Sequence, residues 1–259
     1  MTTSIRLLTG LLACATLGAQ PAPVLRPGSN QSFLEELAAA CRILAKQGVV
    51  DAYGHVTVRS PMNPDHYFMS RNLPPALAQA KDLVEYDLDS QPVSANAPPG
   101  FTDRYIHGEI YRARPDVMSV VHFHAPEVIP YGVTGVPLRP IFHMAGFLGD
   151  GIPTFEIRDT AGVTNMLISN AELGKALART LGSKPAALMR GHGAVVAASA
   201  LHIAVGQAYY MTTNARIQAE AMRMSANVTY LTPEEARKAG AQDGFERAWA
   251  LWKTEVGLK

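Results

Sequence analysis

Apolar and polar positions follow two different periods along this chain, and the changes of period predict both helices and strands. From Ser32 the apolar residues recur every three or four positions, which predicts a helix with Ser32 as a possible N-cap and Gly48 as its stop. Further helical spacing is found at 102–112, 161–181, 201–224 and 233–256. Short apolar or alternating runs predict strands at 55–59, 66–70, 83–88, 117–124, 186–189 and 194–198. The last helix is expected to have Thr232 as its N-cap and Pro233 as its first residue.

The predicted strands and helices alternate without a clear linker after residue 31, which favours one α/β domain. Helices packed on a central sheet are the natural solution for this order of elements. The segment 20–31, QPAPVLRPGSNQ, is rich in proline, glycine and polar residues, so we expect a linker there. The folded domain is therefore expected to span 32–259.

The first 19 residues have the layout of a signal peptide. Arg6 supplies a positive charge, an apolar run extends to about Leu17, and the small residues Gly18 and Ala19 precede the expected cleavage point. The apolar run is too short to span a bilayer as a helix, so we expect no integral membrane span and export to the periplasm or the medium. A lipoprotein is the second interpretation, because the residues around Cys14 resemble a lipidation box.

Composition excludes several classes of function. The chain has 259 residues, of which 47% are hydrophobic and 17% charged, so it is long and apolar enough to bury a large core. Its 23 basic residues balance 22 acidic ones, which argues against nucleic acid or an anionic membrane as a partner. Once a signal peptide is removed only Cys41 remains, and one cysteine forms neither an internal disulfide nor a thiolate metal cage.

Three histidines carry the strongest chemical signal. His122 and His124 are two residues apart at the end of a predicted strand, so the strand period points both rings to one face. Pro126 ends that strand, and α/β folds place ligands at such strand ends. His192 stands between two glycines that allow a sharp turn. A single such histidine is also compatible with a structural ring, but the three together predict a site for zinc or another divalent ion with open positions for substrate.

An acidic residue precedes the histidine pair in the predicted helix. Asp103 and His107 are four residues apart, and hence on one helix face. Asp103 is also in the first turn, where the helix dipole favours a negative charge. Taken alone, this position favours a helix cap over a catalytic acid or base.

The chain resembles the class II aldolase and adducin family in three segments: GHVTVR at 54–59, TDRYIHGEIYRARPDVMSVVHFHAP at 102–126, and RGHGAVV at 190–196. The resemblance covers about 33–225. It implies a single three-layer α/β domain with a central mixed, largely antiparallel sheet, and a homotetramer with active sites at subunit interfaces. It also implies one divalent metal ion, zinc first and manganese, cobalt or iron next. By the same resemblance the metal ligands are His122, His124 and His192, and Asp103 acts as acid and base.

The chain departs from the sugar-phosphate enzymes of that family where they bind phosphate. His55, the run at 70–73 and the pair at 101–102 replace small hydrogen-bond donors, which argues against a phosphorylated substrate. The SRN stretch, the ARPDV block and PIFHMAGFLG at 140–149 instead resemble dihydroxyphthalate decarboxylase-like enzymes. Substrate contacts are accordingly expected from Arg71, His55, His143, Phe101 and Thr102. For Arg71 a surface ion pair, and for His143 a structural ring, are the competing interpretations.

The expected function is a divalent-metal-dependent carbon–carbon lyase that decarboxylates a non-phosphorylated, hydroxylated, aromatic carboxylate. A metal-stabilised enolate would serve both decarboxylation and aldol cleavage, with Asp103 moving the proton. Three alternatives stay open: an aldolase for a non-phosphorylated hydroxy-carbonyl substrate, an iron(II)-dependent oxygenase, and a non-catalytic adducin-like interaction module. Phe245, Trp249 and Trp252 form an aromatic stripe that more often packs than contacts substrate.

Overall fold

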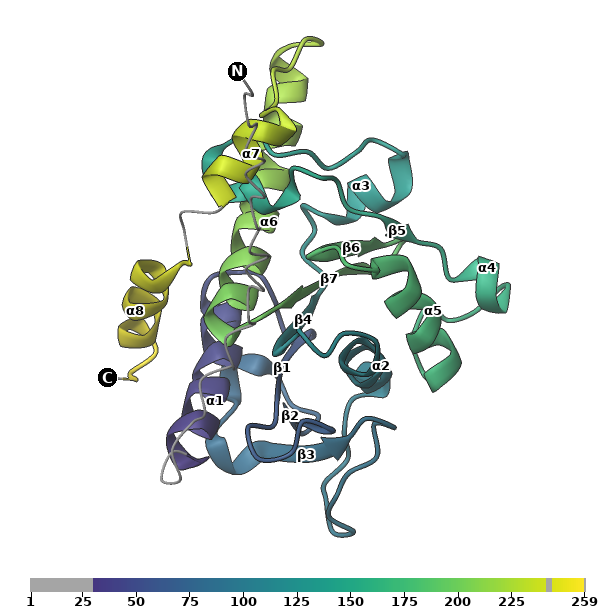
Figure 1. Cartoon of the computed structure of the whole chain (residues 1–259), viewed down its shortest axis with the longest axis vertical. Coiled ribbons are helices and arrows are strands. Elements are labelled where there is room, and N and C mark those ends of the chain that lie inside the picture. The colour runs from purple at the N-terminus through teal and green to yellow at the C-terminus, as the bar shows by residue number, and fades with distance from the viewer. Residues whose placement is uncertain (1–29, 241–243, 259) are drawn as a thin grey trace, which may run out of the picture.

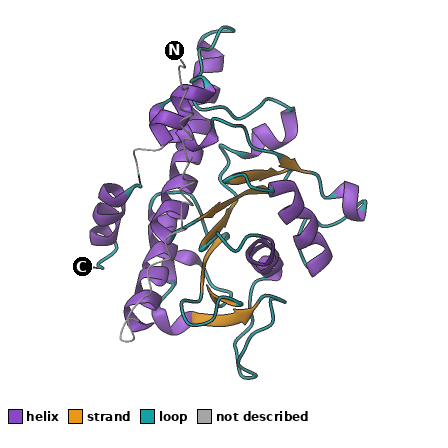
Figure 2. Ribbon diagram, viewed as in Figure 1, coloured by secondary structure: helices purple, strands orange, loops and turns teal. Residues whose placement is uncertain are grey.

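A seven-stranded sheet forms the middle layer of the computed structural model, which describes residues 30–240 and 244–258 (Figures 1 and 2). The strands are β1 (His55–Arg59), β2 (His66–Ser70), β3 (Leu83–Asp87), β4 (Ser119–Phe123), β5 (Thr154–Phe155), β6 (Ala186–Met189) and β7 (Gly193–Ala198). Their order is β3-β2-β1-β4-β7-β6-β5, and every pair is antiparallel except the parallel pair β5–β6. The predicted mixed, largely antiparallel sheet is confirmed.

Helices cover both faces of the sheet and complete the predicted three layers. On one face lie α1 (Asn30–Lys46) and α6 (Leu201–Met224), with α8 (Glu246–Glu255) packed outside them (Figure 1). On the other face lie α2 (Tyr105–Ala113) and α5 (Ala171–Leu181), which contact each other extensively. The shorter helices are α3 (Ile129–Thr134), α4 (Arg158–Ala161) and α7 (Pro233–Gly240). None of the helices within the described ranges is long and apolar enough to cross a membrane.

The central strand β4 serves both helical layers. Its five residues are buried, and because side chains alternate along a strand, neighbours belong to different cores. Val121 and Phe123 pack in the cluster that contains α1 and α6, whereas Val120 packs with α2 and α5. His122 follows Val120 by two residues and therefore lies on the α2 side of the sheet. Burial of the apolar faces thus fixes where the histidine points.

The predicted helix at 161–181 is wrong in its first half. Helix α4 ends at Ala161, and α5 begins only at Ala171. Gly162 (φ 65°) and Met166 (φ 71°) adopt left-handed backbone conformations that interrupt a helix. Asn170 then caps α5, because its side-chain oxygen accepts a hydrogen bond from Leu173 N at 3.0 Å. The intervening segment, 162–170, runs beside the site described below.

The predicted helix at 233–256 is also wrong as one continuous element, since α7 ends at Gly240 and α8 begins at Glu246. Phe245 precedes α8 with a φ of 63°, which a continuous helix does not allow. The start of α7 is confirmed: the Thr232 hydroxyl accepts from Glu235 N at 3.2 Å, and Glu235 accepts from Thr232 N at 2.8 Å. The aromatic stripe packs as expected, because Phe245, Trp249 and Trp252 are all buried.

The N-terminal predictions fall largely outside the described residues. The signal peptide, Cys14 and the linker up to residue 29 lie there. The first helix begins at Asn30 rather than Ser32. The predicted helix at 102–112 is a 3-10 turn, Thr102–Arg104, followed by α2. Helix α3 and the two-residue strand β5 were not predicted.

Candidate metal centre

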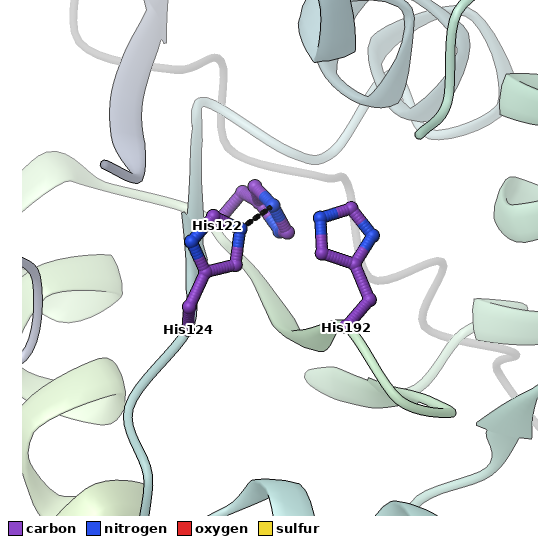
Figure 3. A group of neighbouring side chains, drawn as sticks. All are labelled: His122, His124 and His192. Carbon is purple, nitrogen blue, oxygen red and sulfur yellow. Dashed lines mark hydrogen bonds between the residues drawn. The ribbon is translucent and has the colours of Figure 1, made fainter. Parts of the chain in front are cut away.

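The three predicted histidines converge at one end of the central strands (Figure 3). His122 is on β4, His124 follows the end of that strand, and His192 lies in the turn between β6 and β7. Each offers one ring nitrogen, and these nitrogens lie within 4.8 Å of one another. The Nε2 atoms of His122 and His124 are 2.9 Å apart. Figure 3 shows that the His192 ring points toward the other two rings from the opposite side of the site.

Glycines shape the turn that carries His192. Gly191 has a φ of 65°, which permits the reversal between β6 and β7. Gly193 lies so close to β4 that a Cβ atom there would stand 2.2 Å from the Phe123 carbonyl oxygen. Arg190 anchors the other side of the turn through two hydrogen bonds to Glu156, one of them 2.9 Å from Nη2 to Oε1. The turn is therefore held at both ends, with His192 in its middle.

Burial keeps the three rings uncharged near neutral pH. Desolvation lowers the pKa of His122 well below its usual value, and the neighbouring histidines lower it further. Burial also lowers the pKa of His124 to about 4, and it lowers the pKa of His192 although Asp103 opposes that shift. Neutral imidazole is the form that binds metal ions.

Hydrogen bonding also leaves these rings able to bind a metal ion. His122 Nδ1 donates to the Ala194 carbonyl oxygen at 3.0 Å, which leaves a lone pair on Nε2. His192 Nδ1 is buried without a hydrogen-bond partner among the residues that the structure describes. Three neutral imidazoles with mutually facing nitrogens fit zinc or another divalent ion that accepts nitrogen ligands. An ion held by these three rings would keep positions open for a substrate.

Asp103 lies beside this group but does not cap the following helix. Neither the 3-10 turn that contains it nor α2 has a side-chain cap bond. Instead, Asp103 Oδ1 accepts a hydrogen bond from Ile168 N at 2.5 Å, and Oδ2 lies 4.0 Å from His192 Nε2. Burial raises the pKa of Asp103, although the nearby His192 ring and the Ile168 hydrogen bond oppose this. A carboxyl group with a raised pKa beside possible metal ligands is suited to proton transfer.

Two of the predicted substrate contacts lie next to the histidines. His55 is the cross-strand partner of His122 in the β1–β4 register, and the two rings are 5.1 Å apart. The Phe101 ring lies 4.7 Å from His55 and is buried, so it forms an apolar wall. Thr102 is exposed, and its side chain makes no hydrogen bond to any residue the structure describes.

Arg71 and His143 have other surroundings. Continuing the β1–β2 register places Arg71 across from His55, but its Nε donates to Asp82 at 2.8 Å, as in the competing ion-pair interpretation. His143 is exposed and lines a cavity of about 580 Å³ between the 3-10 segment His143–Leu148, α6 and α7. None of the three converging histidines lines that cavity. The substrate roles of Arg71 and His143 stay predictions.

A buried chain of hydrogen-bonded side chains behind the site was not predicted from the sequence. His55 Nδ1 lies 2.7 Å from His107 Nε2, and His107 Nδ1 lies 2.8 Å from the Thr57 hydroxyl. That hydroxyl lies 2.8 Å from the phenol oxygen of Tyr111. Two sequence spacings are consistent with it. His55 and Thr57 are two residues apart and share one strand face, and His107 and Tyr111 are four residues apart and share one helix face. Neither spacing alone shows that the two faces meet.

The family assignment rests on most of the chain. Residues 35–219 match the class II aldolase and adducin N-terminal domain. Decarboxylase tropJ from Talaromyces stipitatus is 39% identical over 84% of this chain and 91% of its own length. The 3,4-dihydroxyphthalate decarboxylase of Arthrobacter keyseri is 27% identical over 89% of this chain and 95% of its own. The chain belongs to the class II aldolase and adducin family.

Solved structures agree with this fold. An aldolase II superfamily protein from Pseudomonas syringae superposes with a TM-score of 0.74 at 22% identity, over 90% of this chain and 94% of that one. An L-fuculose 1-phosphate aldolase from Glaciozyma antarctica gives a TM-score of 0.72 at 20% identity, over 92% of both chains. Within its family the protein is an enzyme of the lyase class, because it matches decarboxylases along nearly their whole length.

Proposed function

We propose that the protein is a divalent-metal-dependent decarboxylase of a hydroxylated aromatic carboxylate that carries no phosphate. One observation carries the proposal: three neutral imidazoles converge beside a carboxyl group whose pKa is raised by burial. The relatives support it, since they are named a decarboxylase and a decarboxylase of 3,4-dihydroxyphthalate, which is a substrate of this class.

His122, His124 and His192 would hold the cation. Zinc suits three imidazoles best, and manganese, cobalt or iron are the other candidates. When bound, a divalent cation supplies Lewis-acid stabilisation of negative charge on substrate oxygens. The hydrogen bond from His122 Nδ1 to Ala194 O would keep that ligand's lone pair directed at the site.

Asp103 is proposed to deliver the proton. Its Oδ1 is occupied by the Ile168 N–H, so a proton on the carboxyl group belongs on Oδ2, the oxygen nearer His192. When the bond between the aromatic carbon and the carboxylate breaks, CO2 leaves and the electron pair stays on the substrate. Asp103 then protonates that carbon and is reprotonated from water.

The walls of the site favour an unphosphorylated aromatic molecule. Phe101 contributes an apolar surface next to His55, and this pair replaces small polar donors. Assembly as a homotetramer with active sites at subunit interfaces, which the family resemblance implies, belongs to this proposal.

The decisive experiment measures CO2 release from dihydroxyphthalates and dihydroxybenzoates by zinc-loaded protein. Asp103→Asn should lower kcat by about 10²- to 10⁴-fold, because it removes the proton donor, while zinc stoichiometry stays unchanged. Asp159→Asn, at an exposed aspartate, is the matched control and should retain activity. Full activity of Asp103→Asn would refute the role of Asp103.

The same assay separates the other reactions. Carbonyl fragments without CO2 would indicate aldol cleavage, and turnover that requires oxygen would indicate an oxygenase. No turnover, together with equal zinc content in wild type and His122→Ala, would leave an interaction module of the adducin kind.

A further inference from the structure

A buried hydrogen-bonded chain behind the candidate metal centre links four residues, which lie on two elements. His55 and Thr57 are on β1, and His107 and Tyr111 are on α2. The most exposed of them is His55, at 4%, so the whole chain is shielded from solvent. Each neighbouring pair is joined by a contact of 2.7 or 2.8 Å.

The distances favour one direction of hydrogen bonding along this chain. If the donors point from Tyr111 toward His55, the hydrogens of Tyr111, Thr57 and His107 each have an acceptor at 2.7 or 2.8 Å. The remaining hydrogen, on His55 Nε2, has no acceptor among the described residues. In the opposite direction, the Thr57 hydroxyl has to donate to Val120 O at 3.5 Å, or the Tyr111 hydroxyl loses its acceptor among the described residues. A contact of 3.5 Å is too long for a good O–H···O bond, and a buried unpaired donor is costly.

The favoured direction fixes the position of the His55 proton. Tyr111 donates to Thr57, Thr57 donates to His107 Nδ1, and His107 Nε2–H donates to His55 Nδ1. Burial keeps the His107 ring neutral, because it lowers the pKa of that ring to about 3. His55 Nδ1 accepts the hydrogen bond from His107 Nε2–H and therefore carries no proton itself. The single proton of the His55 ring therefore stands on Nε2.

That proton bears on how the site binds a cation. His55, Asp103 and His122 offer ligand atoms within 4.8 Å of one another, as a second group that shares His122 with the three-histidine group. A nitrogen that carries a proton has no lone pair for a cation, but it is a hydrogen-bond donor. His55 Nε2 makes no hydrogen bond to any described residue, while Nδ1 is occupied by His107.

We propose that the chain of Tyr111, Thr57 and His107 fixes His55 as a hydrogen-bond donor to an anionic oxygen of the substrate and keeps His55 out of the metal coordination. This inference rests on the proposed decarboxylase function and extends it. Tyr111, Thr57 and His107 are positioning residues, since they act through His55. The substrate is thereby expected to place a carboxylate or phenolate oxygen next to Phe101, where the His55 ring lies.

The first test reads the tautomers directly, in protein labelled with ¹⁵N-histidine and without metal. His55 and His107 should both carry their proton on Nε2, and addition of 3,4-dihydroxybenzoate to the zinc-loaded protein should shift the His55 Nε2–H signal. Thr57→Val should abolish the single tautomer, whereas Thr57→Ser, which keeps the hydroxyl, should retain it. A wild-type His55 protonated on Nδ1, or a signal unmoved by the ligand, would overturn the proposal.

The second test measures zinc binding. His55→Ala should bind zinc with wild-type stoichiometry, whereas His124→Ala should lose affinity by at least about 10-fold. Equal loss in the two variants would make His55 a ligand and refute the assignment. Neither test depends on turnover, so a protein that fails to decarboxylate any substrate would refute the proposed function without deciding these results.

The third test links the chain to catalysis. Thr57→Val and Tyr111→Phe should each lower kcat/KM by about 10-fold at unchanged zinc content, and Thr57→Ser should restore it. Tyr86→Phe is the matched control, because the buried Tyr86 hydroxyl has no hydrogen-bond partner among the described residues. An equal loss in Tyr86→Phe would show that general damage to the core explains the effect, and would refute the positioning role.

Discussion

Gly193 lies where the candidate metal centre has no room for a Cβ atom. A Cβ atom there would lie 2.2 Å from Phe123 O and 3.1 Å from the Cα of His124. Both contacts involve backbone that cannot rotate away, so any side chain has to push β7 from β4. His192 precedes this glycine in the sequence, and His124 lies against it in space, so such a shift would move two of the three histidines.

Gly193→Ala should therefore lower zinc affinity at least about 10-fold and the free energy of unfolding by roughly 1–3 kcal/mol. Gly132→Ala is the matched control, since its new Cβ would meet atoms no closer than 3.6 Å. Zinc titration and urea denaturation of both variants measure the two effects. Wild-type zinc affinity in Gly193→Ala would contradict the close approach.

At the residue scale, sequence spacing predicted the convergence of the three histidines but not the surroundings of each. The two-residue period places His122 and His124 on one face, and the flanking glycines indicate a tight turn at His192. The contact between Asp103 and Ile168 N joins segments 65 positions apart, so no local pattern reports it. The hydrogen bond between His55 and His107 was missed for the same reason.

At the scale of single elements, the start of α5 depends on one side chain. Asn170 accepts from Leu173 N and ends the non-helical segment whose Ile168 N–H holds Asp103. Asn170→Ala should lower the free energy of unfolding by about 1 kcal/mol, because a cap bond is lost. Chemical denaturation checks this, with exposed Asn96→Ala as control. Equal stability of the two variants would exclude a capping role.

The elements themselves were predictable where one period persists. All of the predicted strands and the long helix α6 were found with bounds that differ by a few residues at most. The two wrong helices share a cause, because apolar spacing continues through glycine-containing segments whose backbone turns left-handed. The helices are interrupted at Gly162 and at Phe245. Local sequence does not require a break at either position, so tertiary packing determines that the helix stops there.

At the scale of the whole molecule, buried neutral histidines link stability to pH. Burial lowers the pKa of His107 from 6.5 to about 3. Between these two pKa values the unfolded chain binds a proton at His107 and the folded chain does not. This destabilising effect is absent above about pH 6.5, and it grows as the pH falls toward the pKa of His107 in the folded protein. For His107 alone the loss of unfolding free energy at pH 5 is about 2 kcal/mol.

Urea denaturation of metal-free protein at pH 7 and pH 5 measures this loss. His107→Gln should show a smaller difference between the two pH values than wild type, whatever its absolute stability. The same substitution at exposed His143 serves as control. An unchanged difference in His107→Gln would show that this ring does not contribute.

The alternation along β4 has a consequence for how the protein tolerates change in length. Val121 and Phe123 face the apolar layer of α1 and α6, whereas Val120 and His122 face the layer of α2 and α5, where the site lies. Deleting any one residue between Ser119 and His122 would exchange the two sets, burying an imidazole among aliphatic groups and exposing valine to the reactants. Such a deletion would disrupt both the fold and the site. We therefore expect no single-residue deletion variant of this strand to keep partial activity.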